Sequence, residues 1–172
     1  MEKRRRTGRV TEKETIKDGL VEEFHDNGQL KGRENYKDGK RDGLRETFYS
    51  KSDNNPFVLH GPIETRSNWK NDKRDGLCER FYENGQLLEM GNFKNGIQDG
   101  LWENFHENGQ YSLIGNYKNG KREGFFWSFH DNDQLSHIFN YKNGKQDGLW
   151  EYFDEDGNLT KTEEYKDGEL IE

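Results

Sequence analysis

Three histidines of this 172-residue chain recur at one place in a repeating sequence, and imidazole is a common metal ligand. His25, His106 and His130 each stand directly before a turn sequence and are each followed by an acidic residue. In adjacent units, His106 and His130 could share an ion. Tyr49 and Tyr82 fill the same position in other units, so the position favours an aromatic ring over a ligand. We therefore expect no metal site.

A column of glutamates could supply the paired carboxylates of an acid–base catalyst. Its members are Glu22, Glu46, Glu79, Glu103 and Glu151. Because a catalytic pair breaks the symmetry of a repeat and this glutamate recurs five times, we interpret it as a structural position, neutralised by neighbouring Lys and Arg. The segment from Asp154 to Glu164 is similar to a calcium loop, but its glycine falls at position four, whereas an EF-hand requires position six.

The remaining candidates for chemistry are a cysteine and the many glycines. Cys78 is the single cysteine, which rules out an intrachain disulfide, and no histidine lies near it in its unit. It shares its column with Val21, Trp102 and Trp150 and is predicted to be a strand residue. No glycine stretch followed by Lys and Ser or Thr forms a phosphate loop. We expect no enzyme activity, no catalytic residue and no cofactor.

The elements that position these residues follow a 24-residue period. Asp-Gly or Glu-Gly pairs recur with steps of 24, 33, 24, 24 and 24 residues, beginning at Gly19. Five residues after each glycine stands a phenylalanine: Phe24, Phe48, Phe81, Phe105, Phe129 and Phe153. A second aromatic column contains Tyr36, Trp69, Phe93, Tyr117, Tyr141 and Tyr165. The residues directly after the glycines are Leu20, Leu44, Leu77, Leu101, Phe125 and Leu149.

Within one unit the side chains alternate with a period of two, as in a β-strand. Leu101, Glu103 and Phe105 share one strand face, and Asn108-Gly109 then gives a strong hairpin signal before residues 111–117 return. A second turn over residues 118–124 leads to the next unit. We predict an all-β fold, an elongated array of about six antiparallel β-hairpins in one curved, twisted sheet. The leucines and both aromatic columns are expected to form ladders on one face, with rings of adjacent hairpins in contact.

Composition and charge bound the domains and the partners. Residues 16–172 are predicted to form the hairpin repeat domain, and residues 1–15 a basic arm or a degenerate cap with Lys and Arg between Lys3 and Arg9. The net charge of −7 disfavours nucleic acid and anionic membrane as partners. The sequence shows no signal-peptide pattern and no stretch long enough to span a bilayer, which favours a soluble, cytoplasmic protein.

The unit "DGLWENFHENGQ", followed after six residues by "NYKNGK", resembles the bacterial variant of the MORN repeat, the YwqK-like antitoxin family. The resemblance runs from about Gly19 to Gly168 and implies a curved sheet of antiparallel hairpins. Eukaryotic relatives are discussed as lipid-binding or protein-binding scaffolds, and some bacterial members carry an antitoxin or immunity label. Asn132-Asp133 and Asn71-Asp72 depart from the Asn-Gly pattern, and the stretch up to Ile16 matches poorly.

Three departures from the period are candidate partner-binding features. The 33-residue step contains an insertion within residues 49–64, whose Phe57 and Leu59 are either packed back on the sheet or offered to a partner. Trp127 occupies the glutamate column. Trp102, Phe126 and Trp150 lie on the face opposite the Phe column, where we expect an exposed stripe about 20 Å long. Alternatively, the sheet curls so that both faces are partly buried.

These features favour a non-enzymatic scaffold that binds another protein. An antitoxin or immunity protein that masks a cognate, basic toxin is the sharper hypothesis, and it rests on the resemblance. The alternative is a peripheral membrane or lipid-binding protein that uses the basic arm and exposed aromatics. Self-association through the open edges of the end hairpins is a further expectation.

Overall fold

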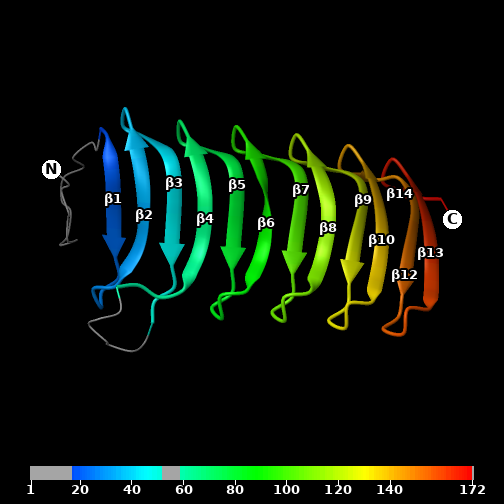
Figure 1. The fold of residues 1–172 in the computed structure, drawn as a ribbon. Coiled ribbons are helices and arrows are strands. Elements are labelled where there is room, and N and C mark those ends of the chain that lie inside the picture. The colour runs from blue at the N-terminus through cyan, green and yellow to red at the C-terminus, as the bar shows by residue number, and fades with distance from the viewer. Residues whose placement is uncertain (1–16, 52–58, 172) are drawn as a thin grey trace.

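The computed structural model describes residues 17–51 and 59–171. These residues form one 14-stranded antiparallel sheet without a helix, whose strands stand side by side along an elongated array (Figure 1). The predicted all-β hairpin array is confirmed. The basic arm of residues 1–15 and Phe57 of the insertion lie outside the described residues, so the domain boundary near residue 16 stays a prediction.

The strands follow chain order through the sheet, apart from the short β11, which pairs with β10 beside β12. They are β1 (Gly19–Phe24), β2 (Leu30–Lys37), β3 (Lys40–Phe48), β4 (Ile63–Lys70), β5 (Lys73–Phe81), β6 (Leu87–Lys94), β7 (Ile97–Phe105), β8 (Tyr111–Lys118), β9 (Lys121–Phe129), β10 (Leu135–Lys142), β11 (Lys145–Gln146), β12 (Gly148–Phe153), β13 (Leu159–Lys166) and β14 (Glu169–Leu170).

Tight turns connect consecutive strands at both ends of the strands. Between β8 and β9, Asn119 and Gly120 have φ of 52° and 78°, as a two-residue turn with two left-handed residues requires. The predicted second turn over residues 118–124 is therefore too long, because Asn119-Gly120 alone reverses the chain and β9 begins at Lys121. Asp133, which stands where other units have glycine, still adopts φ of 67°, a conformation that Asp tolerates.

The insertion lies between β3 and β4, as its position in the period predicts. Its described ends are hydrogen-bonded to the sheet: the Tyr49 amide donates to the Pro62 carbonyl at 2.9 Å, and the Leu30 amide donates to the Leu59 carbonyl at 2.8 Å. The Leu59 side chain is nevertheless 78% exposed. The backbone of residue 59 is thus docked on the first hairpin while its side chain faces solvent.

One face of the sheet, which we call the ladder face, carries a continuous row of seven rings. They are Phe93, Trp102, Tyr117, Phe126, Tyr141, Trp150 and Tyr165, and successive ring centroids lie 4.9 to 6.0 Å apart. Most of these contacts are edge-on or tilted, the arrangement that aromatic quadrupoles prefer. The row runs across β6 to β13 and links four hairpins of the array through side chains.

Glycines make room for the largest rings of this row. A Cβ at Gly115 would lie 2.1 Å from the Phe126 ring, and a Cβ at Gly91 would lie 2.3 Å from the Trp102 ring. Gly91 pairs with Trp102 and Gly115 pairs with Phe126, so each ring occupies space that a side chain on the neighbouring strand would otherwise fill. Burial on this face therefore depends on alternating rings and glycines, not on a second layer of structure.

The expected exposed stripe is wrong. Trp102, Phe126 and Trp150 are 7%, 0% and 9% exposed, because strand pairing places them on the same face as the second aromatic column, with glycine beneath two of them. The predicted single-face ladder is wrong as well. The Phe column and the residues directly after the glycines occupy the opposite face, which we call the leucine face.

On the leucine face, the column from Leu20 to Leu149 is 38% to 51% exposed, so these side chains are not the buried ladder that the sequence predicts. The Phe column is mostly half-buried, and Phe48 is buried. Tyr111 joins two units of this column, with ring centroids 4.8 Å from Phe105 and 6.4 Å from Phe129. The alternative in which both faces are partly buried describes the sheet better.

Candidate functional site

The recurrent rings before the turns act as staples between hairpins. The Nε2 atoms of His25, His106 and His130 donate to the carbonyl oxygens of Phe48, Phe129 and Phe153 at 3.2, 3.0 and 3.1 Å. The hydroxyls of Tyr49 and Tyr82 donate to the carbonyls of Phe81 and Phe105 at 2.7 and 2.9 Å. Histidine and tyrosine thus donate to the equivalent carbonyl, that of the Phe column residue in the next unit. Within residues 17–51 and 59–171, no group of three or more His, Cys, Asp or Glu could hold a metal ion.

The last turn lacks this staple. Asp154 takes the position of the ring and accepts hydrogen bonds from the amides of Asp156 and Asn158 at 3.1 and 2.8 Å. These bonds hold the pKa of Asp154 below its usual value, with the Asn158 amide as the largest cause. Because a carboxylate cannot donate, a hairpin stacked against β13 would receive no hydrogen bond from this position.

In five of the six Asp-Gly or Glu-Gly pairs, all except the one that contains Asp42, the acid has a structural task that the sequence reading missed. Asp75 accepts a hydrogen bond from the amide of Asn95 at 3.0 Å, and Glu123 accepts one from the amide of Asn143 at 2.7 Å. The acids cap the two-residue turn of the following hairpin. The signal was present in the sequence, because an acid precedes this glycine in every unit.

On β3 and β5, in the first half of the array, the glutamate column is neutralised as expected. Glu46, whose side chain is 7% exposed, pairs with Arg33 at 2.6 Å and with Arg66 at 3.3 Å. Arg66 also reaches Glu79 at 3.4 Å. Arg33 and Arg66 come from the strands on either side of Glu46, so the ions alternate in sign across β2 to β5 on the leucine face.

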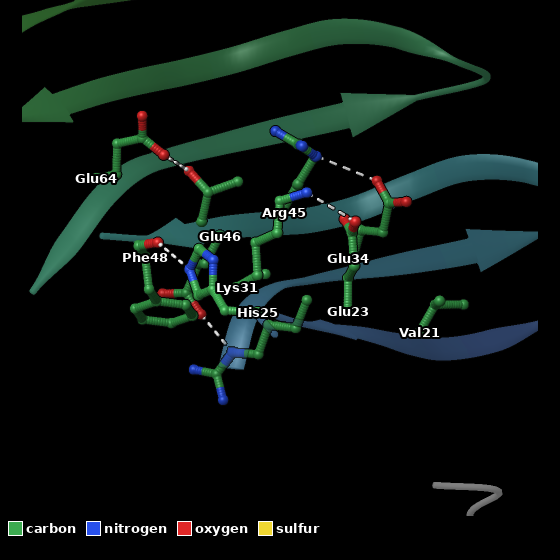
Figure 2. A pocket seen from close by; sticks show the side chains of 12 residues that line it. Val21, Glu23, His25, Lys31, Glu34, Arg45, Glu46, Phe48 and Glu64 are labelled. Atoms are coloured by element: carbon green, nitrogen blue, oxygen red, sulfur yellow. Dashed lines mark hydrogen bonds and ion pairs between the residues drawn. The ribbon is translucent and has the colours of Figure 1, made fainter. Parts of the chain in front are cut away.

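A cavity of about 250 Å³ adjoins these pairs beside the first hairpin. Figure 2 shows that its charged side chains point toward one another and make the drawn contacts among themselves. Lys31 pairs with Glu23 at 2.8 Å, and Thr47 donates to Glu64 at 2.9 Å. The cavity therefore offers a ligand a set of groups already engaged with each other.

Glu34 anchors a polar cluster on the ladder face, where the later hairpins have rings. Arg41 and Arg45 pair with its carboxylate at 2.7 and 3.1 Å, and the Tyr36 hydroxyl donates to it at 2.8 Å. Burial alone raises the pKa of Glu34, but the hydrogen bonds from Arg41 and Tyr36 outweigh it and leave the pKa below its usual value. The first hairpins thus use ions on both faces.

In the second half of the array, the same row of the leucine face changes character. The positions of Arg33 and Arg66 are taken by Met90, Ile114, Ile138 and Thr162. Glu103 and Glu151 make no salt bridge among the residues that the structure describes. Glu103 accepts only a hydrogen bond from the Tyr111 hydroxyl at 3.1 Å.

Between these two glutamates lies an exposed apolar surface, which we call the Trp127 patch. It consists of Leu101, Ile114, Phe125, Trp127, Ile138 and Leu149. Phe125, Leu101, Leu149 and Trp127 are 51%, 50%, 47% and 38% exposed, and the two isoleucines are half-buried beside Trp127. The Phe125 and Trp127 ring centroids are 5.9 Å apart. Asn116 pairs with Leu101 and Asn140 pairs with Phe125, so amide side chains stand between these exposed apolar residues. Exposed apolar side chains gathered in this way are typical of interaction sites.

Of the five predicted partner-binding residues that the structure describes, Trp127 alone lies in this patch. Leu59 is exposed but lies far from the patch in the array, because its carbonyl accepts a hydrogen bond from Leu30 at the start of β2. Trp102, Phe126 and Trp150 are buried on the other face. The sequence reading missed Leu101, Phe125 and Leu149 as surface residues. Each of them lies two residues before a member of the glutamate column on the same strand, and this spacing could have placed them on the same face as the glutamates.

Comparison with known proteins bears on the whole array. The family model described as MORN repeat variant matches residues 17–38, 74–95, 98–119 and 146–167, together 88 of the 172 residues. Each match covers one hairpin, whereas the β3–β4 hairpin with the insertion and the β9–β10 hairpin with Trp127 are not matched. A search of curated proteins finds no match. No helix in the described residues is long and apolar enough to cross a membrane.

Proposed function

The chain belongs to the family of MORN repeat variants, and we propose that it is a non-enzymatic scaffold that binds another protein through the Trp127 patch. MORN repeats are commonly protein- or membrane-interaction modules. The recurring His and Asp positions in this chain have structural tasks in hairpin stapling and turn capping, and Glu46 and Glu79 form ion pairs. Recognition is therefore the function for which the array has uncommitted surface.

The observation that carries this proposal is the exposure of large apolar side chains around Trp127 on one face of β7 to β12. Trp is enriched at the centres of protein interfaces, and covering such a patch stabilises a complex through apolar burial. The patch is centred on β9, which belongs to a hairpin that the family model does not match. The same hairpin that departs from the repeat pattern thus carries the strongest candidate contact.

A sharper form of the proposal is an antitoxin or immunity protein that masks a cognate, basic toxin. Its support is the resemblance to the bacterial repeat variant and the net charge of −7. Masking by shape and charge requires no catalytic residue. Co-expression with toxin genes that neighbour its own gene tests this form: rescue of growth supports it, and growth arrest despite stable expression of the scaffold contradicts it.

The general proposal is tested by capture from the native cell with a matched control. The double variant Phe125→Ser/Trp127→Ser removes the centre of the patch, and Leu77→Ser changes a side chain as exposed as Trp127, at 38%, outside it. A protein retained by the wild type and by Leu77→Ser, but not by the double variant, is then purified. Direct calorimetric titration should show at least tenfold weaker binding to the double variant. Equal binding to all three proteins contradicts the proposal.

The peripheral-membrane alternative depends on the basic residues between Lys3 and Arg9, since the chain as a whole is acidic. Sedimentation with phosphatidylserine vesicles, with and without residues 1–9, separates it from the protein-binding proposal. Sedimentation that is lost with the arm supports a membrane role. If neither protein sediments, membrane binding through this arm is excluded.

A further inference from the structure

The Trp127 patch is bounded at both ends of its central row by carboxylates. Strand pairing joins Glu103 to Ile114, Ile114 to Trp127, Trp127 to Ile138, and Ile138 to Glu151. The row therefore has the order Glu-Ile-Trp-Ile-Glu across five neighbouring strands. With about 4.8 Å per strand, the two glutamates stand about 19 Å apart.

The same column supplies an internal comparison for these two glutamates. Glu46 and Glu79 meet Arg33 or Arg66 on adjacent strands, at 2.6 to 3.4 Å. Glu103 and Glu151 face isoleucine in the place of arginine, and no cation pairs with them within residues 17–51 and 59–171. A partner that covers the patch also takes water from these carboxylates, which costs free energy unless it brings its own cation.

This charge pattern discriminates between occupants of the patch. A second copy of the chain that covered the patch with its own would bring four carboxylates to one rim, and like charges in an interface are unfavourable. Anionic lipid and acidic proteins would face the same repulsion. A neutral apolar segment would bury the rings but leave both carboxylates without a counter-charge.

We therefore infer that the Trp127 patch binds a cationic segment of a partner protein, in which apolar side chains cover Trp127 and two Lys or Arg residues, about 19 Å apart, pair with Glu103 and Glu151. The inference rests on the proposed function and specifies the chemistry of the partner. Basic side chains of this kind also have apolar stems that can pack along the patch.

A display library of random 16-residue peptides, selected on the wild-type protein in low salt, serves as the probe. The library is depleted on Trp127→Ser beforehand, so that retained peptides depend on the patch. We expect enriched peptides to carry Lys or Arg on both sides of an apolar centre. Synthetic copies of these peptides should bind Glu103→Gln and Glu151→Gln about fivefold more weakly than the wild type, an effect typical of single charge pairs. Their affinity should fall further in 0.5 M salt, because salt screens charge pairs.

Two variants control for charge and folding. Glu83→Gln removes the same charge from an exposed turn outside the patch and should leave peptide binding unchanged. Glu103→Lys/Glu151→Lys should lose the basic peptides and gain copies in which Glu replaces the Lys and Arg residues. That reciprocal gain cannot come from an unfolded protein.

The outcomes separate this inference from the proposed function. Peptides that require Trp127 but bind Glu103→Gln/Glu151→Gln like the wild type overturn the cationic partner and leave the protein-binding scaffold standing. Enrichment of acidic or neutral peptides overturns it in the same way. If no peptide distinguishes the wild type from Trp127→Ser, both proposals fail. A concentration-dependent dimer in sedimentation velocity that Trp127→Ser abolishes overturns the inference in favour of a second copy.

Discussion

The glutamate column of the leucine face has different neighbours in the first and second halves of the array. Across β2 to β5, Glu46 is buried between two arginines and closes a ladder of ions. Across β7 to β12, isoleucines replace the arginines and Trp127 replaces a glutamate. The same row of paired positions thus forms internal ion pairs in the first half of the array. In the second half it forms an apolar surface with a glutamate at each end.

The ladder face changes in step with the leucine face. In the first half it carries the polar cluster of Glu34, Arg41 and Arg45, and in the second half it carries the buried rings around Phe126. Because the rings stabilise the second half from one side, its other side is not needed for internal pairing. The comparison teaches that a single-layer sheet can concentrate its stability on one face and leave the opposite face for a partner.

The largest expected effect comes from removing the fully buried ring of the second half. Phe126→Ala should lower the free energy of unfolding by about 3–5 kcal/mol, since it leaves a cavity over Gly115. Cys78→Ala changes the same column in the first half and should cost about 1 kcal/mol. Urea unfolding followed by tryptophan fluorescence measures both. Equal losses would contradict the assignment of stability to the ring row.

The glutamate column gives the most direct test of the difference between the halves. Glu46→Gln should cost about 1–2 kcal/mol, because two half-exposed arginines lose their shared partner. Glu103→Gln should stay within about 0.5 kcal/mol, as expected for a carboxylate outside an ion pair. Thermal unfolding at pH 7 compares them. If both substitutions cost the same, the column has one role throughout the array.

The last hairpin predicts a loss of stability in acid. Lys161 and the Tyr152 and Tyr165 hydroxyls donate to Glu163 and lower its pKa from 4.5 to about 2. A carboxylate whose pKa is lower in the folded state stabilises the protein above its unfolded pKa, so this contribution is lost between about pH 4.5 and 2. Unfolding midpoints measured from pH 7 to 2.5 should fall less steeply for Glu163→Gln than for the wild type.

The matched control for this experiment is Glu155→Gln, an exposed residue in the turn of the same hairpin. It should keep the pH dependence of the wild type. A parallel loss of pH dependence in both variants would assign the effect to the net charge of the hairpin and not to the Glu163 hydrogen bonds. Glu34, whose pKa is also lowered, adds stability in the same direction at the other end of the ladder face.

The fold was predictable because local signals agree with the period. Asn-Gly turns, strict alternation and a phenylalanine at a fixed distance from each glycine all specify hairpins of one length. The insertion between β3 and β4 was placed correctly by the same arithmetic. The turn at residues 118–124 was predicted too long, because Gly124 was taken as a turn residue although it lies within β9.

Burial was harder to predict, because a single-layer sheet has no inner face that the period alone can identify. Trp102 and Phe126 were expected in solvent, and the residues that bury them are Gly91 and Gly115 on neighbouring strands. That pairing depends on the register between hairpins, which the sequence does not state. Trp127 was singled out correctly as a departure from its column, but the leucines that complete its patch were assigned to the core.

The smallest expected effect on stability separates folding from recognition at Trp127. Trp127→Glu restores the glutamate of the column and should change the free energy of unfolding by no more than about 0.5 kcal/mol, because the ring is 38% exposed and lies outside the row of buried rings. Urea unfolding of the variant beside the wild type measures this. A loss above about 2 kcal/mol, the range of buried apolar side chains, would make Trp127 a packing residue, and its exposure would then lose its meaning as a sign of binding.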